Sequence, residues 1–325
     1  MTFPITSGTY SFVVQASDII RQAMLNIKRL DAEEVPTTQE TTDCLRVLNM
    51  MCKQWMGKSD FAPGLKIWTR KRGYMLLNGQ GNSRIIGTDD GGIVAKGWSN
   101  DLTVTTLAAT AAASDTSISV SDGTGFATSQ VVAIELDAGY LFYTTASSVS
   151  GTTVGVGALP SQASAGNAVF TYTTAAQNPR TIETALLRDQ SFSDTPLQII
   201  RDVKTYDLIP NKADVTNVGD PSVIYVEAGL WGSTVYTDVG ACQDVGKYIV
   251  ITFLEPVQDF NTSADYPYYP QEWYLALCWG LTEQIAPMFG GSWNDKMESL
   301  KNNAIAIARN TSSEISELYF QPGNE

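Results

Sequence analysis

Histidine, the side chain that most often transfers protons near neutral pH, does not occur in this sequence of 325 residues. Its absence excludes Ser–His–Asp and Cys–His nucleophiles, histidine general bases and zinc sites with histidine ligands. Carboxylates could still act in pairs, as in glycoside hydrolysis, but sequence does not show which of the 34 acids approach one another. We therefore expect a protein that is not an enzyme and has no cofactor and no metal site.

The cysteines are the remaining soft ligands and nucleophiles. None of them forms a CxxC pair, so the spacing does not indicate a zinc site. Cys44 and Cys52 lie about 12 Å apart along one expected helix, which is too far for a disulfide. We predict buried free thiols, typical of a reducing compartment. The four residues are Cys44, Cys52, Cys242 and Cys278.

Two short motifs could contact phosphate groups. Residues 79–84 (GQGNSR) begin like a dinucleotide-binding loop, but an arginine replaces the third glycine and no helical pattern follows. A hairpin turn is the better interpretation of that motif. Arg70, Lys71 and Arg72 form the only dense basic cluster. A lone basic tripeptide on a strand is more typical of a solvated edge or of salt-bridge partners than of a nucleic-acid site.

Aromatic and acidic residues concentrate between Asp265 and Tyr274, in the run DYPYYPQEWY. Such a run could form a sugar-binding platform. The alternative is a helix that begins near Pro270 and packs its aromatic rings on the protein body, which is the commoner arrangement.

Charge divides the chain into three blocks. Residues 1–96 carry 12 basic and 9 acidic side chains, residues 97–179 carry 5 acids and no cation, and residues 180–325 carry 9 basic and 20 acidic side chains. The net charge of −13 argues against a protein that grips a nucleic-acid backbone, because that needs clustered Lys and Arg. The long run without a cation is the clearest boundary in the composition.

Hydrophobic periodicity predicts helices at both ends of the chain. One helix runs from about Ser17 to Leu30, and a second begins with the capping box Thr37-x-x-Glu40 and reaches Trp55. Their short linker indicates an antiparallel αα-hairpin. Two further helices begin near residues 270 and 292. The last helix is expected to bury one stripe, which consists of Met297, Leu300, Ala304, Ile307, Thr311, Ile315 and Leu318.

Extended segments are expected between the two helical ends, including the alternating strand at residues 248–254. Short strands rich in Thr, Val, Ala and Ser, separated by Gly and Asp turns, predict a small antiparallel barrel or sandwich at 101–175. The predicted fold is therefore α+β. It has a discontinuous body with a helical core at 1–100 and 176–325, an inserted all-β domain at 101–175, and an extended tail at 319–325.

Membrane and secretion signals are not evident in the sequence. No stretch reaches 18 apolar residues, and the chain before Arg21 has neither a cation nor a continuous apolar run. We expect synthesis and folding in a cytoplasm and no membrane partner.

Two segments resemble the head-to-tail adaptor proteins of short-tailed bacteriophages, also called tail accessory factors, head-completion proteins or tail tubular protein A. The first segment is similar in its two helices, its acidic linker and the ending "LN…W", carried by Leu48, Asn49 and Trp55. The second is similar in its aromatic helix entry and the following apolar helix. Its matching residues are Pro270, Glu272, Trp273, Leu281, Ala286, Pro287 and Gly290. The resemblance covers about residues 1–95 and 176–325, whereas 101–175 departs from the pattern.

This resemblance implies a structural protein of the virion neck or tail, synthesised in the host cytoplasm. Such a protein forms a homo-oligomeric, dodecameric ring beneath the portal protein, extends the DNA channel and attaches a tail nozzle or tail fibres. Double-stranded DNA then passes without tight binding during genome ejection, which an acidic lumen favours by repulsion. The alternative function is a receptor- or carbohydrate-binding virion protein that uses the 101–175 segment with the aromatics at 266–274.

Two site hypotheses follow from the adaptor interpretation. Arg70, Lys71 and Arg72, in the slightly basic block, are expected to pair with acids of an adjacent subunit. The tail is expected to dock into the portal, because its aromatic residues have no evident core partner. The tail residues in this hypothesis are Tyr319, Phe320, Gln321 and Pro322.

Overall fold

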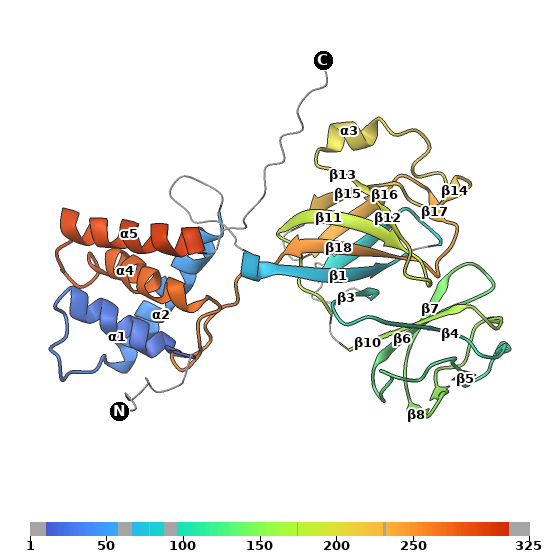
Figure 1. Ribbon diagram of the computed structural model, residues 1–325, viewed down its shortest axis with the longest axis horizontal. Coiled ribbons are helices and arrows are strands. Elements are labelled where there is room, and N and C mark those ends of the chain that lie inside the picture. Colours follow the sequence, from blue (N-terminus) through green and yellow to red (C-terminus); the bar gives the residue numbers. More distant parts are fainter. Residues whose placement is uncertain are drawn as a thin grey trace, which may run out of the picture. The chain divides into compact units, whose positions relative to one another are not determined.

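The computed structural model describes residues 11–57, 67–77, 79–87, 96–173, 175–229 and 232–311. They form a mixed α+β protein, which confirms the predicted fold class, and they fall into two compact units (Figure 1). The helical unit takes the chain up to Thr69 and from Pro256 onward, and the β unit runs from Arg70 to Glu255. Within the described ranges, no helix has both the length and the apolar character needed to span a membrane.

Helix α4 (Tyr274–Ile285) is the centre of the helical unit, because α1, α2 and α5 all pack against it. The 3-10 turn η2 (Gln271–Trp273) leads into α4, and η1 (Ile67–Thr69) precedes the boundary to the β unit. The remaining helices are α1 (Ala16–Asn26), α2 (Thr38–Trp55) and α5 (Asp295–Thr311). The apolar periodicity that predicts α1, α2 and α4 is confirmed by the burial of their apolar side chains. The fully buried side chains include Ile19, Ile20, Met24, Leu48, Trp273, Leu277, Leu281 and Ile285.

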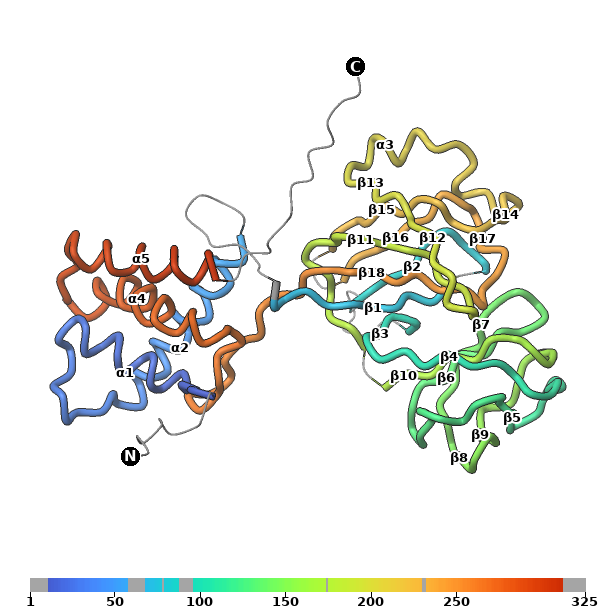
Figure 2. The backbone as a smooth tube through the Cα atoms, in the orientation of Figure 1, coloured from blue at the N-terminus to red at the C-terminus, as the bar shows by residue number. Residues whose placement is uncertain are grey.

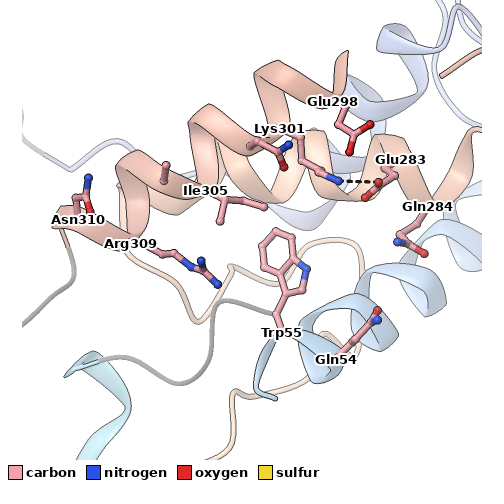
Figure 3. A pocket seen from close by; sticks show the side chains of 11 residues that line it. Gln54, Trp55, Glu283, Gln284, Glu298, Lys301, Ile305, Arg309 and Asn310 are labelled. Carbon is pink, nitrogen blue, oxygen red and sulfur yellow. Dashed lines mark hydrogen bonds and ion pairs between the residues drawn. The ribbon is translucent and has the colours of Figure 1, made fainter. Parts of the chain in front are cut away.

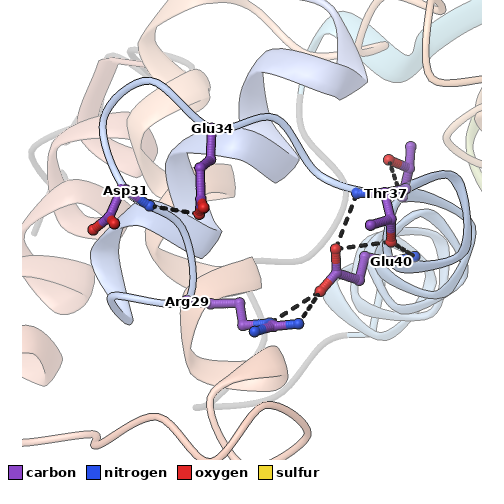
Figure 4. A network of polar contacts seen from close by, with 6 residues as sticks. Arg29, Asp31, Glu34, Thr37 and Glu40 are labelled. Atoms are coloured by element: carbon purple, nitrogen blue, oxygen red, sulfur yellow. Dashed lines mark hydrogen bonds and ion pairs between the residues drawn. The ribbon is translucent and has the colours of Figure 1, made fainter.

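The linker between α1 and α2 is fixed by hydrogen bonds to carboxylates (Figure 4). The Thr37 hydroxyl accepts from the Glu40 N–H at 3.3 Å, and the Glu40 carboxylate accepts from the Thr37 N–H at 2.9 Å. This pair confirms the predicted capping box. Arg29 donates to the same carboxylate at 2.7 and 2.9 Å, and the Asp31 N–H donates to Glu34 at 3.1 Å. The start of α2 is therefore tied to the end of α1.

Helix α5 buries only part of the stripe that periodicity predicts. Ala304 of that stripe is buried together with Ala308, which lies outside it, whereas Leu300 and Ile307 of the stripe are 40% and 63% exposed. Ile315 and Leu318 lie outside the described residues. The small alanines let α5 approach α4 closely, and an ion pair of Lys301 with α4, at 2.6 Å, fixes the rotation. The predicted stripe and the observed buried face both follow three- and four-residue spacing. Periodicity alone therefore does not show which face of α5 is buried.

Strand β18 is the centre of the β unit and is covered on both faces. Its residues Ile249, Ile251 and Phe253 belong to one apolar cluster, and Tyr248 and Val250 belong to another. A strand buried on both faces has few sites for polar side chains, which explains its continuous apolar run. Its five-stranded sheet has the order β12 (Asp194–Pro196), β11 (Thr181–Arg188), β18 (Tyr248–Leu254), β1 (Arg70–Leu76) and β3 (Trp98–Ser99).

A second sheet shares one of these two cores. Ile86, Ile224 and Val235 from its strands cluster with the first set of β18 residues. Strands β13 and β15 are parallel and the other pairs are antiparallel. The sheet order is β13 (Gln198–Ile200), β15 (Val223–Ala228), β16 (Gly232–Thr237) and β2 (Ser83–Gly87). Helix α3 (Val203–Asp207) and the parallel pair β14 (Val218–Gly219) and β17 (Ala241–Cys242) connect these strands.

The segment predicted as an inserted domain forms two antiparallel sheets around one core, which includes Ile118, Val132, Val154 and Val169. Phe170 is fully buried, and its ring lies 6.0 Å from that of Tyr248 in β18. The segment therefore contacts the five-stranded sheet within the β unit, and its independence as a domain stays a prediction. The four-stranded sheet has the order β4 (Thr103–Thr106), β10 (Ala168–Tyr172), β6 (Val131–Glu135) and β7 (Leu141–Thr145). The three-stranded sheet has the order β5 (Ser117–Ser119), β9 (Thr153–Gly155) and β8 (Ser148–Ser150).

The chain enters and leaves the β unit through two neighbouring strands (Figure 2). Strand β1 begins at Arg70, strand β18 ends at Leu254, and these two residues are paired directly. The β unit is thus an insertion whose two ends meet, so the helical unit can be assembled from both ends of the chain.

Candidate functional site

The basic cluster predicted at a subunit interface lies on β1, where two of its cations have partners in the same chain. Arg70 donates to the Glu183 carboxylate at 2.5 and 3.2 Å. The Lys71 ammonium lies 3.7 Å from the Glu255 carboxylate, and Arg72 is exposed. Pairing with an adjacent subunit stays a prediction. If Arg70 and Lys71 also pair with acids of an adjacent subunit, each cation will contact two carboxylates, one in its own chain and one in its neighbour.

The four tail residues predicted to dock into the portal, at positions 319–322, lie outside the described residues, which end at Thr311. That hypothesis stays a prediction.

The aromatic run at 265–274 enters the helical core. Trp273 is fully buried, and Tyr269 and Tyr274 are 9% and 8% exposed. The Trp273 ring lies 6.2 Å from that of Trp55 and 5.4 Å from that of Trp68. These rings pack α4 against α2, so their faces are not available as a sugar-binding platform.

The cysteines are all free thiols, as the sequence predicts. Burial raises the pKa of Cys44 to about 11 and the pKa values of Cys52 and Cys278 to about 12. These thiols therefore stay protonated at neutral pH and are poor nucleophiles and ligands. Over the described part of the chain, no group of three Cys, Asp or Glu side chains is arranged to hold a metal ion.

A groove of about 740 Å³ opens on the helical unit, between the end of α2 and the adjoining parts of α4 and α5 (Figure 3). It is lined by Gln54 and Trp55 of α2, Glu283 and Gln284 of α4, and Glu298, Lys301, Asn302, Ile305, Ala306, Arg309 and Asn310 of α5. Most of the lining side chains are amides or charged groups, and Trp55 and Ile305 are its two large apolar members.

Trp55 of α2 and Ile305 of α5 point toward each other across the groove (Figure 3). Trp55 can lie against α4 because residue 280 is glycine: a Cβ atom there would be 2.5 Å from the indole ring. On the groove wall Lys301 donates to Glu283 at 2.6 Å, so this pair is neutral. Trp55 is only 9% exposed, so the groove presents mainly polar and charged side chains.

Sequence patterns do not reveal this groove, because its lining comes from both ends of the chain and meets only in the folded unit. The one local signal is Trp55, a large ring at the end of the apolar stripe of α2. No protein-family model matches this sequence, and no curated protein matches it.

Proposed function

We propose that this protein is a structural subunit of a bacteriophage virion, a head-to-tail connector that forms a ring beneath the portal. In this proposal the ring continues the DNA channel and provides the attachment site for further tail components. Ring contacts join identical subunits, so each subunit must offer two different complementary surfaces.

One observation carries the proposal: the two segments that resemble the adaptor family pack into one helical unit. Asn49 donates to the Phe260 carbonyl at 2.8 Å and accepts from the Phe260 N–H at 2.9 Å. The rings of Trp55 and Trp273 lie 6.2 Å apart. Trp55 of the first segment thus contacts Trp273 of the second within one helical unit, and the β unit is inserted between the two segments.

Charge pairing supports a role next to passing DNA. Besides Arg70, the cations Arg188, Lys247 and Lys301 donate to carboxylates of the same chain at 2.6, 2.5 and 2.6 Å. The remaining excess of acids repels the DNA backbone, and neutralised cations release few counterions on contact with it. Fluorescence anisotropy with duplex DNA at about 150 mM salt should therefore show no binding.

Negative-stain electron microscopy tests the proposal. The full chain is mixed with the portal ring of the phage that encodes it, and a portal ring of an unrelated phage serves as the control. We expect a twelvefold ring on one end of the cognate portal only. If the chain fails to bind an intact cognate portal, the proposal is wrong.

The carbohydrate-binding alternative has no comparable support. Most of the aromatic rings on which it depends are packed in the helical core, and of the aromatic residues at 265–274 only Tyr266 is largely exposed, at 59%. We therefore advance the connector alone.

A further inference from the structure

Residues 101–175 are joined to the rest of the β unit by a small shared core. Ala133, Ala168 and Phe170 of this segment cluster with Tyr248 of β18. Most of the segment's other buried apolar side chains form a separate core within it. Because that core is internal, the segment can loosen from the five-stranded sheet without losing its own packing.

Glu135 is a half-buried carboxylate at the contact between the segment and the rest of the β unit. It is the last residue of β6, and its Oε2 atom accepts a hydrogen bond from the Ala168 N–H at 2.7 Å. The same oxygen faces Gly246, in the chain that leads into β18. A Cβ atom built on Gly246 would lie 2.8 Å from that oxygen. Glu135 is therefore enclosed on both sides of the contact.

Two further polar groups converge on the same glycine. The Asp244 Oδ1 atom and the Gln190 Nε2 atom would lie 3.0 and 2.7 Å from a Cβ atom at Gly246. The glycine thus leaves the space that these groups and the Glu135 carboxylate fill together. One carboxylate from each side of the contact is thereby brought close to the other.

The facing loop does not neutralise Glu135. Its cation, Lys247, donates to Asp220 at 2.5 Å and lies 3.7 Å from the Oδ2 atom of Asp244. Asp189, in the turn between β11 and β12, also attracts this ammonium and raises the pKa of Lys247. Lys247 is therefore shared among other acids, and over the described part of the chain no cation pairs with Glu135.

Burial raises the pKa of Glu135 above its ordinary value of 4.5. The Ala168 N–H opposes this shift, and the charges of Asp244 and Asp137 add to it. The folded chain therefore binds the Glu135 proton more tightly than the unfolded chain does. The resulting stability is gained as the pH falls through the folded value and is lost as the pH rises. At neutral pH the ionised carboxylate opposes the contact in which it lies.

We propose that Glu135 is a pH-sensitive latch: ionisation of its carboxyl loosens the contact of residues 101–175 with the five-stranded sheet, and protonation tightens it. Asp244, on the other side of the contact, strengthens this response by its like charge. The inference concerns the β unit alone and does not depend on the connector function.

Hydrogen–deuterium exchange of the full chain tests the latch, with rates corrected for the intrinsic effect of pH. In the wild type, the amides of β6 and β10 should be protected about threefold more at about pH 5 than at about pH 8. Glu135→Gln still accepts from the Ala168 N–H and has no charge to lose. Its protection at the higher pH should rise about threefold and should no longer change with pH.

Two neighbouring carboxylates provide matched variants. Asp137 is exposed and accepts from the Ser164 N–H at 2.9 Å, so Asp137→Asn should lower protection and keep its pH dependence. Asp244→Asn removes the like charge across the contact and should reduce the difference between the two pH values without abolishing it. A pH dependence that is unchanged in Glu135→Gln, or that is lost in Asp137→Asn, would overturn the inference.

Discussion

At the scale of single residues, the helical unit depends on one close approach. Gly280 in α4 lies under the indole of Trp55, and an added Cβ atom would be 2.5 Å from that ring and 2.8 Å from the Met51 sulfur. The Trp55 ring is itself packed against Trp273, so it has little room to move. A glycine that appears unfavourable inside a helix is therefore required by packing.

We predict that Gly280→Ala destabilises the helical unit. Overpacking costs about 1–3 kcal/mol, whereas the better helix propensity of alanine returns at most about 1 kcal/mol. The net loss of about 1–2 kcal/mol should appear in chemical denaturation followed by tryptophan fluorescence. Gly219→Ala is the control, because its Cβ would meet nothing closer than Val239, at 3.5 Å. A more stable Gly280→Ala variant would show that Trp55 is not constrained there.

At the scale of elements, local sequence patterns predict where the helices lie but not always which face of a helix is buried. The capping box at Thr37 and Glu40 lies where its sequence predicts, because all its bonds form within four residues. The predicted buried stripe of α5 was right at Ala304 and wrong at Leu300 and Ile307, because α5 packs Ala304 and Ala308 against α4.

The capping box predicts a pH dependence. Hydrogen bonds from the Thr37 N–H, first, and from the Thr37 hydroxyl and Arg29 lower the pKa of Glu40 below its ordinary value of 4.5. A carboxyl with a lowered pKa in the folded state stabilises the protein above its unfolded pKa, and this contribution is lost as pH falls through the folded value. Gln can still accept from the Thr37 N–H, so Glu40→Gln loses mainly the charge beside Arg29 and should cost about 0.5 kcal/mol at neutral pH.

Thermal unfolding of both proteins at several pH values checks this prediction. The difference between wild type and Glu40→Gln should shrink as the solution is acidified below pH 4.5. Glu33→Gln, at an exposed position of the same linker, is the control and should show little difference at any pH. If the loss of stability in Glu40→Gln stays constant down to acid pH, the charge of the Glu40 carboxylate does not contribute to stability.

At the scale of the whole molecule, the chain is a helical unit interrupted by a β unit. The ends of the insertion are joined by the direct pairing of Arg70 with Leu254, and the insertion has its own cores on both faces of β18. An insertion with adjacent ends and its own core can fold without its host.

We predict that a fragment of residues 70–255 folds by itself. Circular dichroism should show a β-rich spectrum and cooperative unfolding. A fragment of residues 70–240 lacks β18, the central strand, and should not fold. Equal behaviour of the two fragments would show that the five-stranded sheet does not organise the unit.

The sequence by itself determined what depends on residue type and short spacing. The absence of histidine, the acidic excess, the helix starts and the β18 run can all be read locally, because composition and nearest-neighbour hydrogen bonds set them. Tertiary structure decided the rest. The hydrogen bond of Asn49 to Phe260 and the close approach of Trp55 to Gly280 form only when distant segments pack together. The buried face of α5 is likewise set by its packing against α4. The groove of the helical unit belongs to this second class, because its lining residues come from both ends of the chain.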